Sequence, residues 1–368
     1  MEKFYQLGKL IFKLTGDGII HQHIAEELSS ISIDKSEAYQ LEFRFVKNLP
    51  EFKNYVLFPP VLTSPTKFQF QRNNFTYQVS KEEHQTLVVL KPALKLKFTE
   101  KILPDNLIKA KDWNYLLPSE AMAKNFMYNI FDYLTQIENL KLSQSYIHAS
   151  SFEKNNKAVA IVAWGGIGKT TSMLKLVTED GWKFLSDDLG VIDEEGMLYR
   201  SPKRLQIYAY NLVGQPKISE RLLSNRTLTD RLSWYMMLKR RGIKGVRRRV
   251  SAEEIFGQQS VSARARLTDV FFIERATVPE FKSQSILAEE LARRASSTIL
   301  SEIEPFNKIA CAVYSGEQSD VIPTQKELFD RTFAVLSKSF SKVNPVLIKI
   351  PLNASPDDLA NYLRKLIK

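Results

Sequence analysis

The feature that most constrains this sequence is a glycine-rich loop set between an apolar segment and a helical pattern. Residues 158–163 form a short apolar run, which predicts a buried strand, and a helix is predicted over 169–179. The order strand, glycine loop, helix is typical of phosphate-binding loops. In such loops, backbone N–H groups turn inward around a phosphate and the helix directs its positive end toward it.

The phosphate-loop pattern requires glycine, four residues, and then Gly-Lys-Ser/Thr. Ala163 stands at the first position, which alanine can occupy if its φ angle is negative. Gly166 and Gly168 permit close approach of the backbone to phosphate. Lys169 is expected to neutralise the β- and γ-phosphates, and Thr170 to offer its hydroxyl to Mg²⁺. A plain turn before a helix is the alternative. The predicted nucleotide-binding segment comprises Gly165, Gly166, Ile167, Gly168, Lys169, Thr170 and Thr171.

Two adjacent acids follow a predicted strand at 184–186. Asp187 lies 18 residues after Lys169, which returns the chain to the phosphate loop after one helix and one strand. One carboxylate is expected to hold Mg²⁺, and the other to accept the proton of an attacking hydroxyl. The pattern does not assign these roles between Asp187 and Asp188. A structural alternative places only one acid in the site, because neighbouring residues of a strand point to opposite faces.

The N-terminal part, residues 1–117, is predicted to be a mainly β module. Alternating segments at 67–71 and 75–79 flank Asn73-Asn74, which indicates a hairpin, and further strands are expected at 86–90 and 94–98. A helix with Ser119 as its N-cap is predicted from 118 to about 140, so residues 118–145 would connect two domains.

Residues 146–368 are expected to form the nucleotide-binding domain. The overall prediction is an α/β (α+β) fold, in which a P-loop kinase core with a mixed sheet and flanking helices follows the β module. Within this domain, strands and helices are predicted along most of its length. Strands are expected at 146–152, 197–199, 270–273 and 346–350, and helices near 285–304, at 326–339 and from 356.

Bulk composition limits the classes of protein that need be considered. Hydrophobic residues make up 44% of the 368 residues and charged residues 25%, as in ordinary globular proteins. The single cysteine, Cys311, excludes an internal disulfide and fits a reducing compartment, so a cytoplasmic location is expected. We find neither a signal-peptide pattern at the N-terminus nor an apolar run long enough for a membrane span.

The segment around the loop resembles the HPr serine kinase family, whose P-loop core is related to phosphoenolpyruvate carboxykinase. The likeness covers about 60 residues, extends loosely to 345–350 and the final helix, and does not include the N-terminal module. It lies in Ile147-His148-Ala149-Ser150-Ser151, in the glycine loop, and in Gly181-Trp182-Lys183-Phe184-Leu185-Ser186-Asp187-Asp188.

The resemblance implies transfer of the γ-phosphate of ATP to a hydroxyl, often a serine of a protein or peptide. It also implies that His148 lies near the aspartates and tunes the protonation of the base; a hydrogen-bonded core histidine is the alternative. The family's magnesium-binding Glu and its Arg-Gly loop have no counterpart in this sequence, so we expect an HPr kinase-like protein rather than HPr kinase proper.

A basic run at 239–249 carries seven cations and contributes to the net charge of +11, which favours an anionic partner. Its two glycines suggest a mobile lid over a phosphotransfer site, and a solvated loop is the alternative. Nucleic-acid binding is the least favoured reading, because the sequence has no RNA-binding aromatic signature and no zinc pattern.

The leading hypothesis is therefore a cytoplasmic kinase that uses ATP and Mg²⁺. Its partners would be a nucleotide and an unidentified acceptor carrying a hydroxyl: a peptide, a protein or a small metabolite such as a sugar. The alternative is an ATP-binding switch or assembly protein with little phosphotransfer activity. A homo-oligomer is compatible with the sequence. Oligomeric state, the role of the β module, and the choice among ATP, another nucleotide and pyrophosphate stay open.

Overall fold

The structure is a computed structural model that describes residues 1–83, 85–303, 306–316 and 321–367. The chain forms two compact units of mixed α/β content. Unit 1 comprises residues 1–98, 118–145 and 300–332, and unit 2 comprises residues 99–117, 146–299 and 333–368. The segment 118–145, expected to connect two domains, thus clusters with the N-terminal strands, and 99–117 clusters with the glycine-loop region.

Unit 1 is built on a sheet with the strand order β3-β1-β2-β4-β9-β8-β7-β6-β5. Its strands are β1 (Glu2–Leu7), β2 (Leu10–Thr15), β3 (Ser32–Ile33), β4 (Leu41–Phe45), β5 (Val56–Phe58), β6 (Val61–Ser64), β7 (Lys67–Arg72), β8 (Phe75–Lys81) and β9 (Thr86–Pro92). Its helices include α1 (Ile19–Glu27), α4 (Pro118–Phe126), α5 (Asp132–Lys141) and α11 (Asn307–Ser315). Phe12 and Phe43 of the sheet pack edge to face at the centre of its core.

The predicted hairpin in unit 1 is confirmed. β7 and β8 pair antiparallel, and the last pair before the turn is Arg72 with Phe75. Asn73 and Asn74 have φ angles of 47° and 67°. This left-handed conformation at both central residues gives a two-residue turn whose twist matches that of the strands, and asparagine tolerates it better than most residues.

The strand predicted over 94–98 is wrong. β8 begins at Phe75, whose register partner is Pro92, so the chain beyond Pro92 has no strand opposite it. Leu96 is 38% exposed, which shows that the alternating side chains there do not meet a core. Helix α2 (Phe98–Ile102) begins instead, followed by α3 (Asp105–Lys111).

The long helix predicted from 118 is formed, but it differs from the prediction in two ways. Pro118, favoured at the first helical position, begins it, so Ser119 lies inside the helix and is not its N-cap. A π-helical turn, Met127–Phe131, then separates α4 from α5. In an α-helix, residues five apart would point about 140° away from each other. The wider turn instead lets Phe126 and Phe131 both pack on Phe43, with ring centroids 5.2 and 5.9 Å away.

Unit 2 contains a mixed sheet with the strand order β11-β10-β13-β14-β17-β19-β18, in which β12 also pairs with β10. β11 runs parallel to β17, and β17 runs parallel to β19. The strands are β10 (Gln144–Lys154), β11 (Lys157–Val162), β12 (Lys183–Ser186), β13 (Leu189–Asp193), β14 (Met197–Tyr199), β17 (Arg264–Ala276), β18 (Lys282–Ser285) and β19 (Asn344–Pro351). A separate pair is formed by β15 (Leu205–Tyr208) and β16 (Arg247–Val250).

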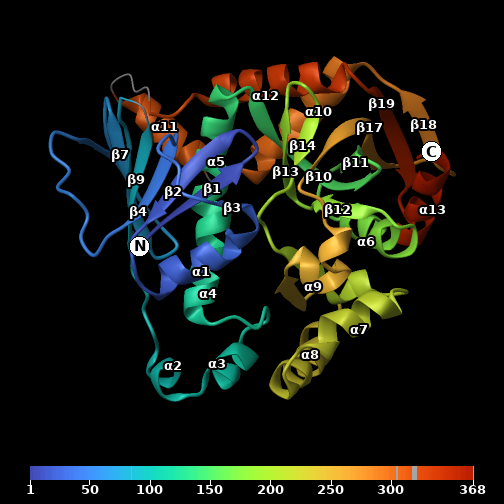
Figure 1. Ribbon diagram of the computed structural model, residues 1–368, viewed down its shortest axis with the longest axis horizontal. Coiled ribbons are helices and arrows are strands. Elements are labelled where there is room, and N and C mark those ends of the chain that lie inside the picture. The colour runs from blue at the N-terminus through green and yellow to red at the C-terminus, as the bar shows by residue number, and fades with distance from the viewer. Residues whose placement is uncertain (84, 304–305, 317–320, 368) are drawn as a thin grey trace. The chain divides into compact units, whose positions relative to one another are not determined.

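Helices cover both faces of this sheet (Figure 1). Alternate residues of β11 enter different cores: Val159 and Ile161 pack toward α6, while Ala160 packs toward α10. Burial on both faces explains why the run at 158–163 is apolar throughout.

No helix of the described residues combines the length and apolar character needed to cross a bilayer. The helices are α6 (Lys169–Glu179), α7 (Pro216–Ser224), α8 (Leu228–Arg241), α9 (Ala252–Phe256), α10 (Ala288–Glu302), α12 (Gln325–Phe340) and α13 (Pro356–Leu366), with the 3₁₀ turn η3 (Ala209–Leu212).

Candidate active site

The glycine loop leaves β11 after Val162 and leads directly into α6. Gly166 and Gly168 have φ angles of 78° and 111°, a region that favours glycine. Gly168 is the N-cap of α6, and a Cβ atom added at Gly165 or Gly166 would meet nothing within 4 Å. Ala163 does not have a positive φ angle, which is the condition under which alanine can stand in place of glycine at this position. The loop therefore presents open backbone at the positive end of a helix.

Lys169, the first residue of α6, lies across the base of this loop. Its side-chain ammonium donates to the carbonyl oxygens of Ala163 and, at 3.1 Å, of Trp164. The Nζ atom also lies 3.4 Å from Nε2 of His148. Lys169 is only 7% exposed, so a positive charge is held in a fixed place beneath the loop.

Strand register brings the two predicted segments of the site to one edge of the sheet. β10 is antiparallel to both β11 and β12, so β11 and β12 run in the same direction. Ala149 of β10 pairs with Val162 near the end of β11, and Ser151 pairs with Ser186 at the end of β12. The glycine loop and the aspartates therefore leave the sheet on either side of the β10 segment that contains His148.

Asp187 meets the first turn of α6. The Thr170 hydroxyl donates to its two carboxylate oxygens at 3.0 and 3.2 Å, and the Ser150 hydroxyl donates to Oδ1. Burial raises the pKa of Asp187, and the neighbouring Asp188 raises it further, while the Ser150 hydrogen bond opposes this. Ser150 was not singled out as a site residue by sequence reasoning, although it lies in the segment that carries the family resemblance.

Asp188 lies in a tight turn and not in a strand, which corrects the picture of two acids alternating along a strand. β12 ends at Ser186 and β13 begins at Leu189, and Asp188 has a φ of 70°. Its carbonyl oxygen accepts from the backbone N–H of Ala149 at 3.1 Å. Aspartate tolerates this left-handed conformation better than most residues.

The Asp188 carboxylate is paired with Lys203, at 3.0 Å from its Nζ atom, and Oδ1 lies 3.8 Å from Nε2 of His148. Burial pushes the pKa of Asp188 upward, but Lys203, His148 and Lys169 together outweigh burial, and the net pKa is lower than usual. Burial, and then Lys169, lowers the pKa of His148 to about 4. At neutral pH, His148 is therefore a neutral imidazole between two ammonium groups and an ionised carboxylate.

Two further residues hold the loop in place and were missed by sequence reasoning. The guanidinium of Arg275, at the end of β17, donates to the carbonyl of Ile167 at 3.4 Å and to those of Leu352 and Ala354 at 2.7 and 3.0 Å. It ties the glycine loop to the segment before α13. On the other side, Asn211 of η3 donates to the Thr171 hydroxyl at 2.7 Å. An arginine two residues after the predicted buried strand 270–273 was the available signal for Arg275.

The basic run at 239–249 is not a continuous loop, contrary to expectation. It comprises the last turn of α8 and the start of β16, with residues 242–246 between them. Arg248 is 1% exposed, and its Nε atom lies 2.7 Å from Oδ1 of Asp230. Its guanidinium also lies 5.3 and 5.2 Å from the rings of Tyr115 and Trp234. Burial of this one cation with a carboxylate and two aromatic faces makes Arg248 part of the core, whereas Lys239, Arg240 and Lys244 of the same run are exposed.

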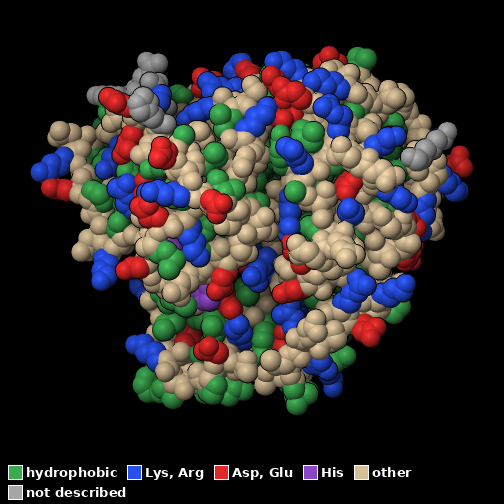
Figure 2. Space-filling view, viewed as in Figure 1, with side chains coloured by type: hydrophobic (Ala, Val, Ile, Leu, Met, Phe, Trp, Pro, Cys, Tyr) green, Lys and Arg blue, Asp and Glu red, His purple; other side chains and the backbone are tan. Residues whose placement is uncertain are grey.

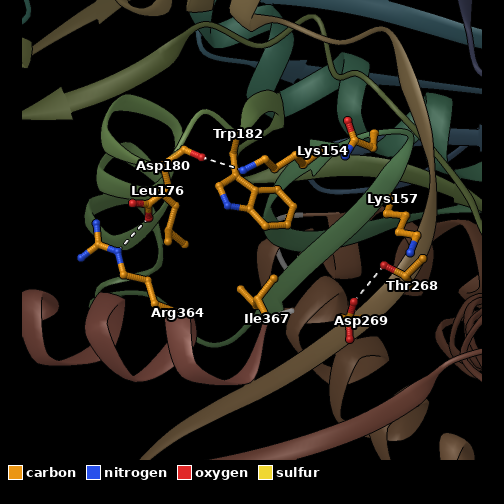
Figure 3. Close-up of a pocket in the computed structure, with 10 residues that line it drawn as sticks. Lys154, Lys157, Leu176, Asp180, Trp182, Thr268, Asp269, Arg364 and Ile367 are labelled. Atoms are coloured by element: carbon orange, nitrogen blue, oxygen red, sulfur yellow. Dashed lines mark hydrogen bonds and ion pairs between the residues drawn. The ribbon is translucent and has the colours of Figure 1, made fainter.

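A pocket of about 490 Å³ lies at the opposite end of β11, away from the glycine loop (Figure 3). Lys157, at the start of β11, and Trp182 line it. Its other charges are largely satisfied within the pocket: Arg364 bonds Asp180 at 2.7 Å, and Lys154 bonds the Asp180 carbonyl at 3.1 Å. The predicted site residues do not line this pocket.

Comparisons with known proteins find little similarity. No protein-family model matches the chain, and no curated protein matches it. Among solved structures, the chain is similar to the HPr(Ser) kinase/phosphatase from Coxiella burnetii, with 12% identity and a TM-score of 0.27. That match covers 60% of this chain and 95% of the other.

Proposed function

We propose that this chain is an ATP-dependent kinase that transfers the γ-phosphate of Mg-ATP to a hydroxyl group. The glycine loop, Gly165 to Thr171, would bind the phosphates through backbone N–H groups and the positive end of α6. Lys169 would neutralise phosphate charge, because its ammonium is already fixed beneath the loop by two carbonyls of that loop.

The observation that carries this proposal is the contact between Thr170 and Asp187. It joins the hydroxyl directly after the loop lysine to the first acid after β12, at 3.0 Å. A hydroxyl and a carboxylate are the hard oxygen donors that Mg²⁺ prefers, so these two residues fit the ion. Within the described residues, no group of three or more His, Cys, Asp or Glu side chains forms a metal site. Phosphate oxygens and water would complete the coordination of Mg²⁺, which would neutralise charge on the transferred group.

Asp188 is the residue we assign as proton acceptor. Its side chain is 34% exposed, and Lys203 keeps it ionised. In the proposed reaction, the acceptor O–H proton passes to the Asp188 carboxylate as the new O–P bond forms. The bond between the γ-phosphorus and the β–γ bridging oxygen breaks, and ADP leaves.

Nucleotide binding is tested by thermal unfolding with Mg²⁺ and ATP, ADP or GTP. A ligand at a hundred times its dissociation constant stabilises the folded state by about 2.7 kcal/mol. We expect ATP to stabilise the wild type and not Lys169→Ala. Lys365→Ala is the control, because Lys365 is an exposed lysine of α13, at the far end of that helix from the loop. If no nucleotide stabilises the wild type, the proposed site is wrong.

Phosphotransfer is tested separately with radiolabelled ATP and pools of serine peptides and sugars. We expect Asp188→Asn to abolish transfer while ATP still stabilises the protein, because the substitution removes the base and leaves the loop intact. Transfer that survives in both Asp187→Asn and Asp188→Asn would rule out the assigned chemistry.

A further inference from the structure

Arg247, at the start of β16, is a half-buried cation held entirely by neutral groups. Its Nε atom donates to Oδ1 of Asn114 at 2.6 Å, and Nη1 donates to the Tyr208 hydroxyl. The guanidinium carbon lies 4.5 Å from the centre of the Trp113 ring and 5.1 Å from that of Tyr208. Across the part of the chain that the structure describes, no carboxylate forms an ion pair with Arg247.

Arg247 differs in this respect from two other cations of the same unit. Arg248 is buried against the Asp230 carboxylate, and Lys203 is buried against Asp188. In both cases the fold supplies a negative charge where it removes a cation from water, as the cost of desolvation requires. Arg247 has a fixed orientation and an uncompensated charge. These are the properties of a preorganised anion-binding guanidinium, because little side-chain entropy is left to lose on binding.

Arg247 is connected to the candidate active site through two stacked tyrosines. The rings of Tyr208 and Tyr210 are 5.1 Å apart, and Tyr210 is 38% exposed. η3, which contains Tyr210, is anchored to the start of α6 by the bond from Asn211 to Thr171. Tyr210 is adjacent to Asn211 in this turn, so the bond holds it beside the start of α6. Arg247 is therefore linked, through Tyr208 and Tyr210, to the turn that is bonded to the start of α6.

Further cations extend away from Arg247 along the end of α8. Arg241 also contacts Trp113: its guanidinium carbon lies 5.7 Å from the centre of the Trp113 ring. Lys239, Arg240 and Lys244 are exposed. Figure 2 shows Lys and Arg side chains at the surface over α7 and α8. A series of separate cations matches an extended ligand with several negative charges better than a small molecule with one.

We propose that Arg247, between Trp113 and Tyr208, binds a carboxylate of an acidic peptide segment whose serine or threonine is the phosphate acceptor. Arg241 and the exposed cations of α8 would attract neighbouring carboxylates of the same segment. Arg247 can donate two parallel N–H bonds to a carboxylate, which would fix the peptide relative to Tyr210 and the aspartates. The role as acceptor site rests on the proposed kinase function; the binding of an acidic peptide does not.

Binding is measured by fluorescence anisotropy with a labelled peptide in which one serine is flanked by glutamates. The same peptide with glutamines in place of glutamates is the ligand control. We expect the acidic peptide to bind, and Arg247→Gln to weaken binding about 10- to 100-fold, as loss of charged hydrogen bonds implies. Lys365→Gln removes the same charge from the far end of α13 and should leave binding unchanged, which separates a site from general attraction to a basic protein.

Two milder variants guard against misfolding. Tyr208→Phe removes only the hydroxyl that accepts from Arg247 and should weaken binding less than Arg247→Gln does. Arg247→Lys keeps the charge but loses the paired donors. We expect its affinity for the peptide to lie between that of Arg247→Gln and that of the wild type. The inference is overturned if the acidic peptide does not bind, if Arg247→Gln and Lys365→Gln weaken it equally, or if a phosphorylated sugar competes as well as the peptide.

The two proposals fail in distinguishable ways. Acidic-peptide binding that depends on Arg247, in a protein that Mg-ATP does not stabilise, would reject the kinase function and keep the peptide site. Stabilisation by Mg-ATP without peptide binding would reject the peptide site and keep the nucleotide site.

Discussion

The hydroxyl of Thr170 and the carboxylate of Asp187 are hydrogen bonded at 3.0 Å, which joins the start of α6 to the end of β12. The contact depends on the register of β10, which sets the ends of β11 and β12 at one edge of the sheet. It places the two oxygen donors that we propose as Mg²⁺ ligands directly beside the glycine loop.

Thr170→Val tests this contact. The substitution preserves shape and removes the hydroxyl, so we expect phosphotransfer to fall by roughly 100-fold or more, as for loss of other transition-state charge stabilisers. Thr170→Ser should restore most activity. The control is Thr178→Val in the same helix, where the hydroxyl is buried and has no hydrogen-bond partner among the described residues, so its removal should leave activity unchanged. Steady-state kinetics that show equal effects of both valine variants would contradict the assignment.

His148 should make stability depend on pH. Burial lowers its pKa to about 4, against 6.5 for the unfolded chain, so the unfolded state binds more protons between these values. The contribution is fully present above pH 6.5 and is lost as pH falls, by about 2–3 kcal/mol at pH 4.5.

Urea unfolding of the wild type and His148→Gln at pH 7.5 and 4.5 measures this effect. The variant should lose less stability on acidification, because glutamine does not titrate. The difference between the two proteins removes the contribution of His21, whose pKa is also lowered by burial. Parallel losses in both proteins would show that His148 is not buried as a neutral imidazole.

Lys203 should set the acidic limb of the pH–rate profile. Burial raises the pKa of Asp188, and the Lys203 ammonium is the main group that opposes burial, so that together with His148 and Lys169 it keeps this pKa below its usual range. In Lys203→Gln the pKa of Asp188 should rise, so the acidic limb of kcat/KM moves to higher pH. Activity on the plateau should be affected less than activity at low pH. An unmoved acidic limb would mean that Asp188 is not the group whose ionisation limits the reaction.

The buried pair of Arg248 and Asp230 should be much more important for stability than an exposed pair. Arg248→Met leaves the buried Asp230 carboxylate with only the partly exposed Arg226, at 3.5 Å, and we expect the free energy of unfolding to drop by about 3 kcal/mol. The matched control is Lys326→Met, which breaks the exposed pair with Asp330 and should change stability by less than about 1 kcal/mol. In the double variant Arg248→Met/Asp230→Leu, much of the loss should be recovered. Denaturant titration distinguishes these outcomes.

Features that depend on neighbouring residues were predictable from the sequence. Gly166 and Gly168 take up left-handed conformations in the loop, and Asn73 and Asn74 do so in the hairpin turn. Such preferences follow from local sterics, which act within a few residues. The apolar run of β11 and the helical period of α6 likewise indicate their own burial, and the mixed α/β class follows from their order.

The tertiary structure alone decided which of these local elements meet. The alternation at 94–98 has no strand opposite it, and the π turn before α5 forms because Phe126 and Phe131 must both reach Phe43. Both depend on partners far away in the chain, which local patterns do not specify.

The same holds for the candidate site. The sequence marked Lys169, Asp187, Asp188 and His148 through their spacing and family likeness. That Lys203 pairs with Asp188, and that Arg248 is buried while Arg247 keeps an uncompensated charge, depends on which strands and helices pack together. A lysine or arginine has the same local preferences in either setting. Its charge is neutralised or left available by groups that only the folded chain brings within reach.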